Sequence, residues 1–212
     1  MCSGRVDLKF IIRAFLKGQD GVFIGGCKLD ECNYVTHGNY DTLANTYICK
    51  KILEHIGLNP ERLRTSFMSG ADGNLLAEYT DDFTKTVREL GPIGKSEGMD
   101  IKKVKFKLKA VEKLIPYMRL VERERLRVPV KSKQTYTEFF ESSEFNRLFN
   151  ELIVDKLAIC QIMMLLHERP ISAGEISEIL GLNPSEVSRH LDVSARQGLV
   201  TFDKSQDLII AA

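Results

Sequence analysis

The stretch "GVFIGGCKLDECNY", residues 21–34, joins a short apolar run to two cysteines in a glycine-rich turn. An apolar run of this length, bounded by glycines, is typical of a strand that is buried on both faces, as in a parallel sheet. Cys27 and Cys32 follow the strand at its carboxyl end, the edge where open α/β sheets hold their ligands. The stretch therefore predicts an α/β layer and places two thiols at its ligand-binding edge.

The rest of the first ninety residues alternates between helix and strand patterns. Apolar residues recur at helical spacing in 7–18, 40–58 and 74–90, and a second strand pattern occupies 63–69. This alternation favours the α/β class and a flavodoxin-like, doubly wound layer. Only two strands are clear, with a remnant of a third expected at 1–3. We therefore expect this layer to be partial, with a segment missing at its N-terminal side.

The next part of the chain is strongly basic. Residues 91–100 are rich in glycine and are expected to be a linker. Between Gly98 and Gln134 the chain has twelve Lys and Arg against four Asp and Glu. Apolar residues at alternating spacings of three and four predict a helix with an apolar seam, which Pro116 should kink. Such a helix either packs on another part of this protein or docks to a partner.

The C-terminal region has the pattern of a winged helix-turn-helix. Two helix patterns, 173–180 and 185–198, are joined by a short turn, and Ser185 is the expected N-cap of the second. Two strand patterns follow, at 199–202 and 207–210, around a polar turn. We therefore expect a small winged domain at the end of the chain.

These patterns divide the chain into three parts. Residues 1–94 form the α/β domain, residues 95–134 a basic helical linker, and residues 135–212 a helical segment with the winged helix-turn-helix. The chain has no apolar run of about 18 residues that could span a membrane and no secretory leader. We interpret it as a cytoplasmic protein, in which thiols stay reduced.

The winged domain is a weak candidate for DNA binding. The side chains of its second helix that would face a DNA groove are those of Ser185, Glu186, Ser188, Arg189, His190 and Arg196. Residues 170–212, however, contain six acidic and three basic residues. Because DNA affinity depends on neutralising phosphates, the domain would need the basic segment 101–133 as an anchor. Winged helices also dock proteins, so DNA is a possible but less favoured partner.

The five cysteines are unevenly placed. Cys2, Cys27, Cys32 and Cys49 lie in the first quarter of the chain, and Cys160 stands alone. Cys49 and Cys160 lie in apolar helical runs, where packing in the core is the favoured interpretation. The α/β layer would bring Cys2 to the same sheet edge as Cys27 and Cys32.

Thiolates on a glycine-rich loop suit an iron–sulfur cluster, because they are soft ligands and backbone N–H groups can donate to the sulfurs. Cys2, Cys27 and Cys32 are the candidate ligands. Zinc held by these three and His37 is an alternative, and so is a reactive redox thiol. The sequence offers no nucleophile–base pair, phosphate-binding loop or paired carboxylates that would indicate bond-making catalysis.

Six motifs in residues 1–94 carry a family resemblance. They are "MCSGRVD" (1–7), "GVFIGGCKLDECNY" (21–34), "GNY" (38–40), "GLNPERLR" (57–64), "SGADGNLLAEYTDDF" (69–83) and "ELGPIG" (89–94). Together they resemble the delta (iron–sulfur) subunit family of methyl-viologen-reducing hydrogenase.

This resemblance implies a small subunit with a 2Fe-2S cluster. Such a subunit passes electrons from a hydrogenase or formate dehydrogenase to the flavin subunit of a heterodisulfide reductase, as in methanogens. Cys2, Cys27 and Cys32 match family cysteines, whereas Cys49 and Cys160 match none. The family also has a strand and a cysteine-pair loop before "MCSGR", which this sequence lacks. We expect either that this front segment has been lost from the chain or that another polypeptide completes the fold. The basic helix and the winged domain are additions to the family's short form.

We therefore expect an electron-transfer subunit of an oxidoreductase complex that performs no bond-making chemistry itself. The alternative is a redox-responsive transcription regulator, in which the cysteine domain senses and the winged domain binds DNA. A third possibility is an adaptor stabilised by zinc.

Overall fold

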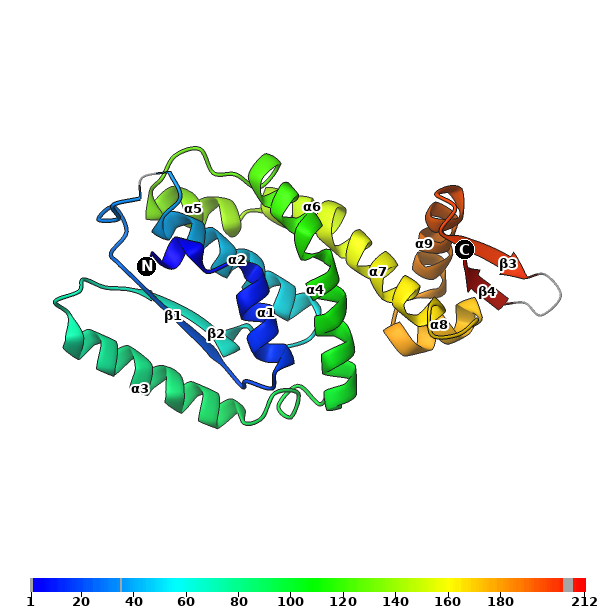
Figure 1. Cartoon of the computed structure of the whole chain (residues 1–212), viewed down its shortest axis with the longest axis horizontal. Helices are drawn as coiled ribbons and strands as arrows, with labels where there is room; N and C mark the ends of the chain where they lie inside the picture. The colour runs from blue at the N-terminus through cyan, green and yellow to red at the C-terminus, as the bar shows by residue number, and fades with distance from the viewer. Residues whose placement is uncertain (1, 35, 204–207) are drawn as a thin grey trace. The chain divides into compact units, whose positions relative to one another are not determined.

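The computed structural model of the protein describes residues 2–34, 36–203 and 208–212. The chain forms two compact units, Met1–Leu148 and Phe149–Ala212, called here the N-terminal and C-terminal units. Figure 1 shows the elements of both units along the chain. The mixed α/β class with a C-terminal helix-turn-helix is as predicted, but most of the chain is helical and both sheets are small. The division at residues 94 and 134 stays a prediction.

The sheet of the N-terminal unit has two strands within the described residues. Strand β1 (Val22–Gly26) pairs in parallel with β2 (Leu63–Phe67) over its whole length, as predicted. The strand is less buried than expected, because Ile24 is its only buried residue. Helix α2 (Asn39–His55) connects them, because a parallel pair needs a long crossover. The cysteine loop therefore leaves the carboxyl end of β1 on its way to α2.

Helices lie on both faces of this sheet (Figure 1). Alternate strand residues point to opposite faces, and Phe23 contacts Phe83 of α3 (Gly73–Leu90) with ring centroids 5.7 Å apart. On the opposite face the hydroxyl of Thr65 lies 2.7 Å from that of Thr46 on α2. A complete doubly wound, flavodoxin-like sheet needs further strands, so that part of the fold class stays a prediction.

The chain enters the N-terminal unit through a tight turn. Residues Ser3–Arg5 form a 3₁₀ turn, η1, so the strand remnant expected at 1–3 is wrong for its described residues. Helix α1 (Leu8–Leu16) follows, and the carboxylate of Asp7 caps it by accepting a hydrogen bond from the Lys9 backbone N–H. Its apolar face is fully buried, as the helical spacing required.

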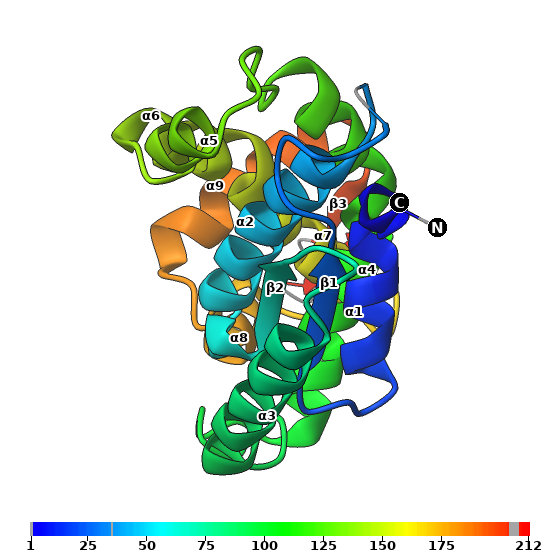
Figure 2. The same cartoon turned by 90° about the vertical axis from the view of Figure 1, so that its left-hand side faces the viewer.

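The basic segment forms one helix, α4 (Ile101–Glu124), which continues through Pro116. It lies beside α1 in Figures 1 and 2, and its apolar seam is buried. Two ion pairs join the helices: Arg13 Nε to Glu112 at 2.8 Å and Arg119 Nε to Asp7 at 2.7 Å. The helix therefore packs on another part of this protein, one of the two expected arrangements. Neither α4 nor any other helix in the described ranges is long and apolar enough to cross a membrane.

The glycine-rich segment 91–100, expected to be a linker, is tied to the core by Arg62. This arginine ends a 3₁₀ turn, η2 (Pro60–Arg62), and its side chain is fully buried. Its Nε donates to Glu97 Oε1 at 2.6 Å, and its Nη1 donates to the carbonyls of Asp20 and Gly91 at 2.9 Å. One side chain thus joins three distant segments of the unit.

Helix α5 (Lys133–Phe140) packs on α2 and extends the core of the N-terminal unit. Tyr47 of α2 stacks on Phe140 with centroids 5.0 Å apart, and Tyr40 contacts Tyr136 at the same separation. Helix α6 (Ser143–Phe149) follows. These aromatic pairs bury large apolar area and close the α2 side of the unit.

The C-terminal unit is a winged helix-turn-helix. Its elements are a π-helical turn η3 (Asn150–Val154), α7 (Asp155–Leu166), α8 (Ala173–Leu180), α9 (Pro184–Arg196) and the antiparallel strands β3 (Val200–Asp203) and β4 (Leu208–Ala211). Asn183, and not Ser185, caps α9, in a capping box with Glu186. The expected polar turn between the strands falls partly on residues 204–207, outside the described residues.

Glu122 on α4 is a carboxyl group whose ionisation the fold disfavours. Burial raises its pKa from 4.5 to about 7, and the carboxylates of Asp41 and Asp7 add to the rise. Stability from this raised pKa is complete below pH 4.5 and is lost as the pH rises through 7. We expect Glu122→Gln to stabilise the chain by about 1–2 kcal/mol at about pH 8.5 but not at about pH 4.5, in urea unfolding. An equal effect at both pH values would contradict this.

Candidate cysteine site

A cleft of about 410 Å³ lies at the carboxyl ends of β1 and β2. Its wall comes from the η1 turn, the end of β1 and the loop that leads from β2 into α3. The residues that line it are Cys2, Ser3, Gly25, Gly26, Cys27, Met68, Ser69, Gly70, Asp72, Gly73 and Leu76. The ammonium of Lys28 lies 3.2 Å from the carboxylate of Asp72 and links the two strand-end loops. This is the sheet edge at which the sequence places a ligand site.

Three thiols meet beside this cleft. The sulfurs of Cys2 and Cys32 are 3.5 Å apart, although thirty residues separate them in the chain. Burial raises the pKa of the Cys27 thiol, and the neighbouring thiols of Cys32 and Cys2 raise it further. The structure thus brings together the three cysteines that the sequence proposed as ligands.

Each of these sulfurs has an N–H donor. The backbone N–H of Gly4 lies 3.4 Å from the Cys2 sulfur, and the side-chain amide of Asn39 lies 3.6 Å from the Cys27 sulfur. Backbone hydrogen bonds from Tyr34 and Asn39 lower the pKa of the Cys32 thiol. Soft sulfur ligands with N–H donors are the chemistry that an iron–sulfur cluster requires, so this donor set fits one.

Asn39 is a site residue that the sequence analysis missed. Its side chain is buried, and its amide donates to the carbonyl oxygens of Cys27 at 3.0 Å and Lys28 at 2.6 Å. It therefore holds the backbone of the cysteine loop in place from the first turn of α2. The signal available was its position in the "GNY" motif at the start of a helix, where a side-chain amide can reach a preceding loop.

Two glycines allow the η1 turn to contact the cysteine loop. A Cβ atom on Gly4 would lie 2.3 Å from the carbonyl oxygen of Gly38, and one on Gly38 would lie 2.8 Å from the Cys32 sulfur. Real Cβ atoms do not approach other atoms this closely. The glycines of "MCSGR" and "GNY" are therefore what lets the sulfurs of Cys2 and Cys32 come together.

The other candidate residues have different surroundings. His37 is exposed, and its Nδ1 lies 3.3 Å from Asp41 Oδ2. Cys49 is fully buried, which raises the pKa of its thiol to about 12, and Cys160 is on α7 in the C-terminal unit. Over the described ranges, no group of three or more His, Cys, Asp or Glu side chains already has the arrangement of a metal site. Metal ligation by the three thiols therefore stays a prediction.

The C-terminal unit exposes only some of the expected DNA-reading side chains. The guanidinium of Arg189 makes two hydrogen bonds to the carboxylate of Asp155, at 3.0 and 2.8 Å. His190 is 4% exposed, so the expectation that it faces a groove is wrong, and Glu186 is engaged in the capping box. Ser185, Ser188 and Arg196 remain exposed on α9, and Asp192 lies among them.

Two family profiles match separate parts of the chain. The profile described as methyl-viologen-reducing hydrogenase, delta subunit, matches residues 1–91, and the profile described as bacterial regulatory protein, arsR family, matches residues 160–201. The first match covers the sheet and the three clustered cysteines. The second covers most of the winged helix-turn-helix, whose fold it supports.

Several curated proteins are similar to the first part of the chain. The iron-sulfur subunit of F420-non-reducing hydrogenase from Archaeoglobus profundus is 44% identical over 91 residues, which are 43% of this chain and 66% of that protein. The iron-sulfur subunit of the vhu F420-non-reducing hydrogenase from Methanococcus maripaludis is 41% identical over 91 residues, 43% of this chain and 67% of that protein.

A larger relative carries a similar segment. It belongs to the ferredoxin/F420H2-dependent CoB-CoM heterodisulfide reductase of Methanosarcina acetivorans, and it is 44% identical over 94 residues, 44% of this chain. The match spans only 12% of that protein's length. Together with the profile match over residues 1–91 and the similarity to the hydrogenase iron-sulfur subunits, this shows that the chain belongs to the methyl-viologen-reducing hydrogenase delta-subunit family.

Proposed function

We propose that the chain is an iron–sulfur electron-transfer subunit in which Cys2, Cys27 and Cys32 ligate a 2Fe-2S cluster. The observation that carries this proposal is the 3.5 Å separation of the Cys2 and Cys32 sulfurs across thirty residues of chain. The names of the hydrogenase relatives as iron–sulfur proteins support it. When bound, such a cluster supplies a one-electron carrier. The protein's part is to hold the thiols together and to direct N–H groups at them.

The electron donor in this proposal is a hydrogenase or formate dehydrogenase, and the acceptor is the flavin subunit of a heterodisulfide reductase. Similarity both to hydrogenase iron-sulfur subunits and to a heterodisulfide reductase polypeptide supports this placement between the two enzymes. A 2Fe-2S cluster takes four ligands, so a fourth must join these three. The winged unit then serves as a protein-docking module.

The test is the iron and acid-labile sulfide content after anaerobic reconstitution, read with the visible and electron paramagnetic resonance spectra. With an exogenous thiol in the reconstitution mixture as the fourth ligand, we expect about two iron and two sulfide per unchanged chain, and less than about a fifth of this in Cys27→Ser and Cys32→Ser, because each removes a thiolate ligand. Cys160→Ser is the matched control, since it removes a thiol in the other unit. It should keep the full content.

Other outcomes would contradict the proposal. Zinc without sulfide would favour the zinc-stabilised adaptor. If no metal were bound after reconstitution, the thiols would be either a redox-active pair or residues that only pack in the fold. Full iron content in both cysteine variants would show that the cluster is held elsewhere.

The second candidate is a redox-responsive regulator that binds DNA through the winged unit. The match of residues 160–201 to the arsR family favours it. The ion pair that holds Arg189 against Asp155 and the acidic balance of the unit count against it. Binding of the full chain to mixed duplex DNA at about 0.1 M salt separates the two candidates, because only the regulator requires it.

A further inference from the structure

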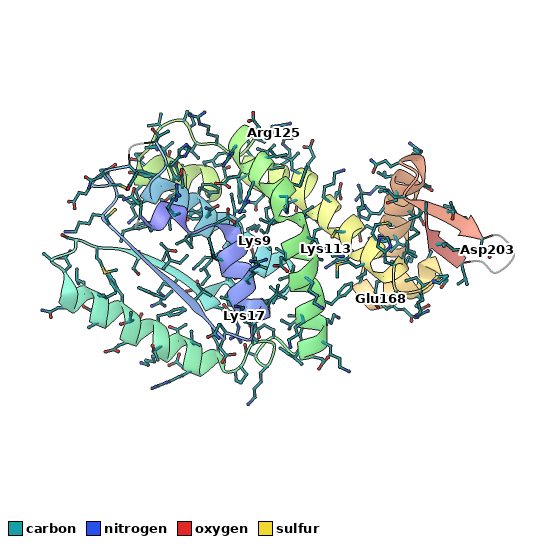
Figure 3. All side chains as sticks on the ribbon, viewed as in Figure 1. Lys9, Lys17, Lys113, Arg125, Glu168 and Asp203 are labelled. Atoms are coloured by element: carbon teal, nitrogen blue, oxygen red, sulfur yellow. The ribbon has the colours of Figure 1, made fainter. Side chains whose placement is uncertain are left out.

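A cationic and apolar surface follows the last turns of α4 and continues to the start of α5. We call it the basic rim; its residues are Leu120, Arg123, Arg125, Arg127, Val130 and Lys133. All six are exposed, and the two apolar side chains are unusually so, Leu120 at 62% and Val130 at 60%. Figure 3 labels Arg125 on this segment.

Two contacts place the rim beside the cysteine loop. The ammonium of Lys131, between Val130 and α5, donates to the carbonyl oxygen of Thr36 at 2.8 Å, and Thr36 lies in the loop that follows Cys32. At the other end of the rim, Arg119 pairs with Asp7, which follows the turn that carries Cys2. The rim therefore lies next to two segments that lead away from the cysteine site, the loop after Cys32 and the start of α1 after Cys2.

Three other arginines of the N-terminal unit are held in ion pairs. Arg13, Arg62 and Arg119 each pair with a carboxylate. In the part of the chain that the structure describes, none of the four rim cations makes an ion pair. Arginine, next to exposed apolar side chains, is enriched in protein–protein interfaces relative to the remaining surface. Unpaired cations around two exposed apolar residues are thus suited to an acidic protein face.

We propose that the basic rim is the docking surface for the electron acceptor, the flavin subunit of a heterodisulfide reductase, which meets it with a carboxylate-rich face around a small apolar centre. This docking proposal rests on the proposed function, and it identifies the face of the N-terminal unit through which the cluster would exchange electrons. Complementary charge steers a transient encounter and fixes its register. A phosphate backbone would use the cations but not Leu120 and Val130, so the surface favours a protein over nucleic acid.

The test compares two charge reversals, one at the end of α4 and in the turn that follows it, the other at the start of the same helix. The rim variant is Arg123→Glu/Arg125→Glu/Arg127→Glu, and the matched control is Lys102→Glu/Lys105→Glu/Lys109→Glu, with the same charge change on exposed residues at the other end of α4. The probe is the purified flavin subunit of heterodisulfide reductase, immobilised, with the reconstituted full-length chain in solution. We expect the rim variant to bind about tenfold more weakly or worse at about 50 mM salt, and the control to change less than about threefold.

Equal weakening by both variants would overturn the proposal, because it would reflect net charge alone. Failure of the unchanged chain to bind the flavin protein would also overturn it. The proposal would also be overturned if the rim variant lost binding to mixed duplex DNA at about 0.1 M salt but still bound the flavin subunit. This result would favour the regulator. Iron and sulfide content is measured in all three chains, so loss of the cluster is distinguished from loss of docking.

Discussion

Replacing Arg62 with methionine is expected to destabilise the N-terminal unit by about 3–5 kcal/mol. The guanidinium is fully buried, and the Glu97 carboxylate that it pairs with is only 6% exposed. Methionine keeps much of the apolar volume but leaves that carboxylate buried without its partner, together with the carbonyls of Asp20 and Gly91. Loss of one partner from an ion pair in the interior costs far more than loss of a surface pair.

Urea unfolding followed by circular dichroism measures this effect. Arg13→Met is the matched control, because it breaks the Arg13–Glu112 pair, in which the arginine side chain is 53% exposed. The control is expected to cost less than about 1 kcal/mol. Similar losses in the two variants would show that the Arg62 interactions do not stabilise the unit.

The same ion pair makes the unit sensitive to acid. Burial opposes ionisation of Glu97, but hydrogen bonds from Arg62 and from the Asn59 backbone more than offset it and lower the pKa from 4.5 to about 2. The stability from this lowered pKa is present above pH 4.5 and is lost as the pH falls toward 2. The Arg62→Met variant lacks this ion pair and has no such stability to lose in acid. The difference in unfolding free energy between it and the unchanged chain should therefore shrink between about pH 6 and pH 3.

Alanine at Gly4 is expected to abolish most of the cluster content. Its Cβ would lie 2.3 Å from the Gly38 carbonyl oxygen and 2.9 Å from the Gly38 Cα, and backbone atoms cannot yield as a flexible side chain can. The η1 turn must therefore move away from the cysteine loop, which separates the Cys2 and Cys32 sulfurs. We expect at least half of the iron and sulfide to be lost, with a destabilisation of about 1–3 kcal/mol.

Gly70→Ala is the control for this substitution. Gly70 lines the same cleft, but a Cβ there would meet no atom within 4 Å. The Gly70 variant should retain full iron content in the same reconstitution assay. If Gly4→Ala also retained it, the close approach of the η1 turn to the loop would not be needed for the cluster.

The elements that the sequence predicted well are those with local signals. The strand 22–26 and the helices of the winged unit are recognisable from apolar spacing, glycines and capping residues within a few positions. The predicted N-cap of α9 was wrong by two residues: Asn183 caps the helix, and not Ser185. Asn and Ser are both favoured at an N-cap, so residue type alone could not choose between them.

The interactions that the sequence could not predict join residues far apart in the chain. Arg62 and Glu97 are separated by 35 residues, and the glycine-rich segment between residues 91 and 100 resembles a linker until its buried partner is known. The pairing of Arg189 with Asp155 likewise spans 34 residues and engages a side chain that was expected to read DNA. No local spacing carries such information.

Local patterns were enough to recognise the class of each part of the chain: a parallel strand pair with thiols at its edge, a basic amphipathic helix and a winged helix-turn-helix. These follow from periodicity, turn residues and motifs, which act within a few residues. The fold was needed to show that the η1 turn, and not a strand, brings the Cys2 and Cys32 sulfurs to 3.5 Å. It was also needed to show that Asn39 holds the cysteine loop and that α4 packs on α1 and leaves the basic rim exposed at its C-terminal end. Those outcomes depend on contacts between distant segments, where packing and burial select one arrangement among many that the local pattern allows.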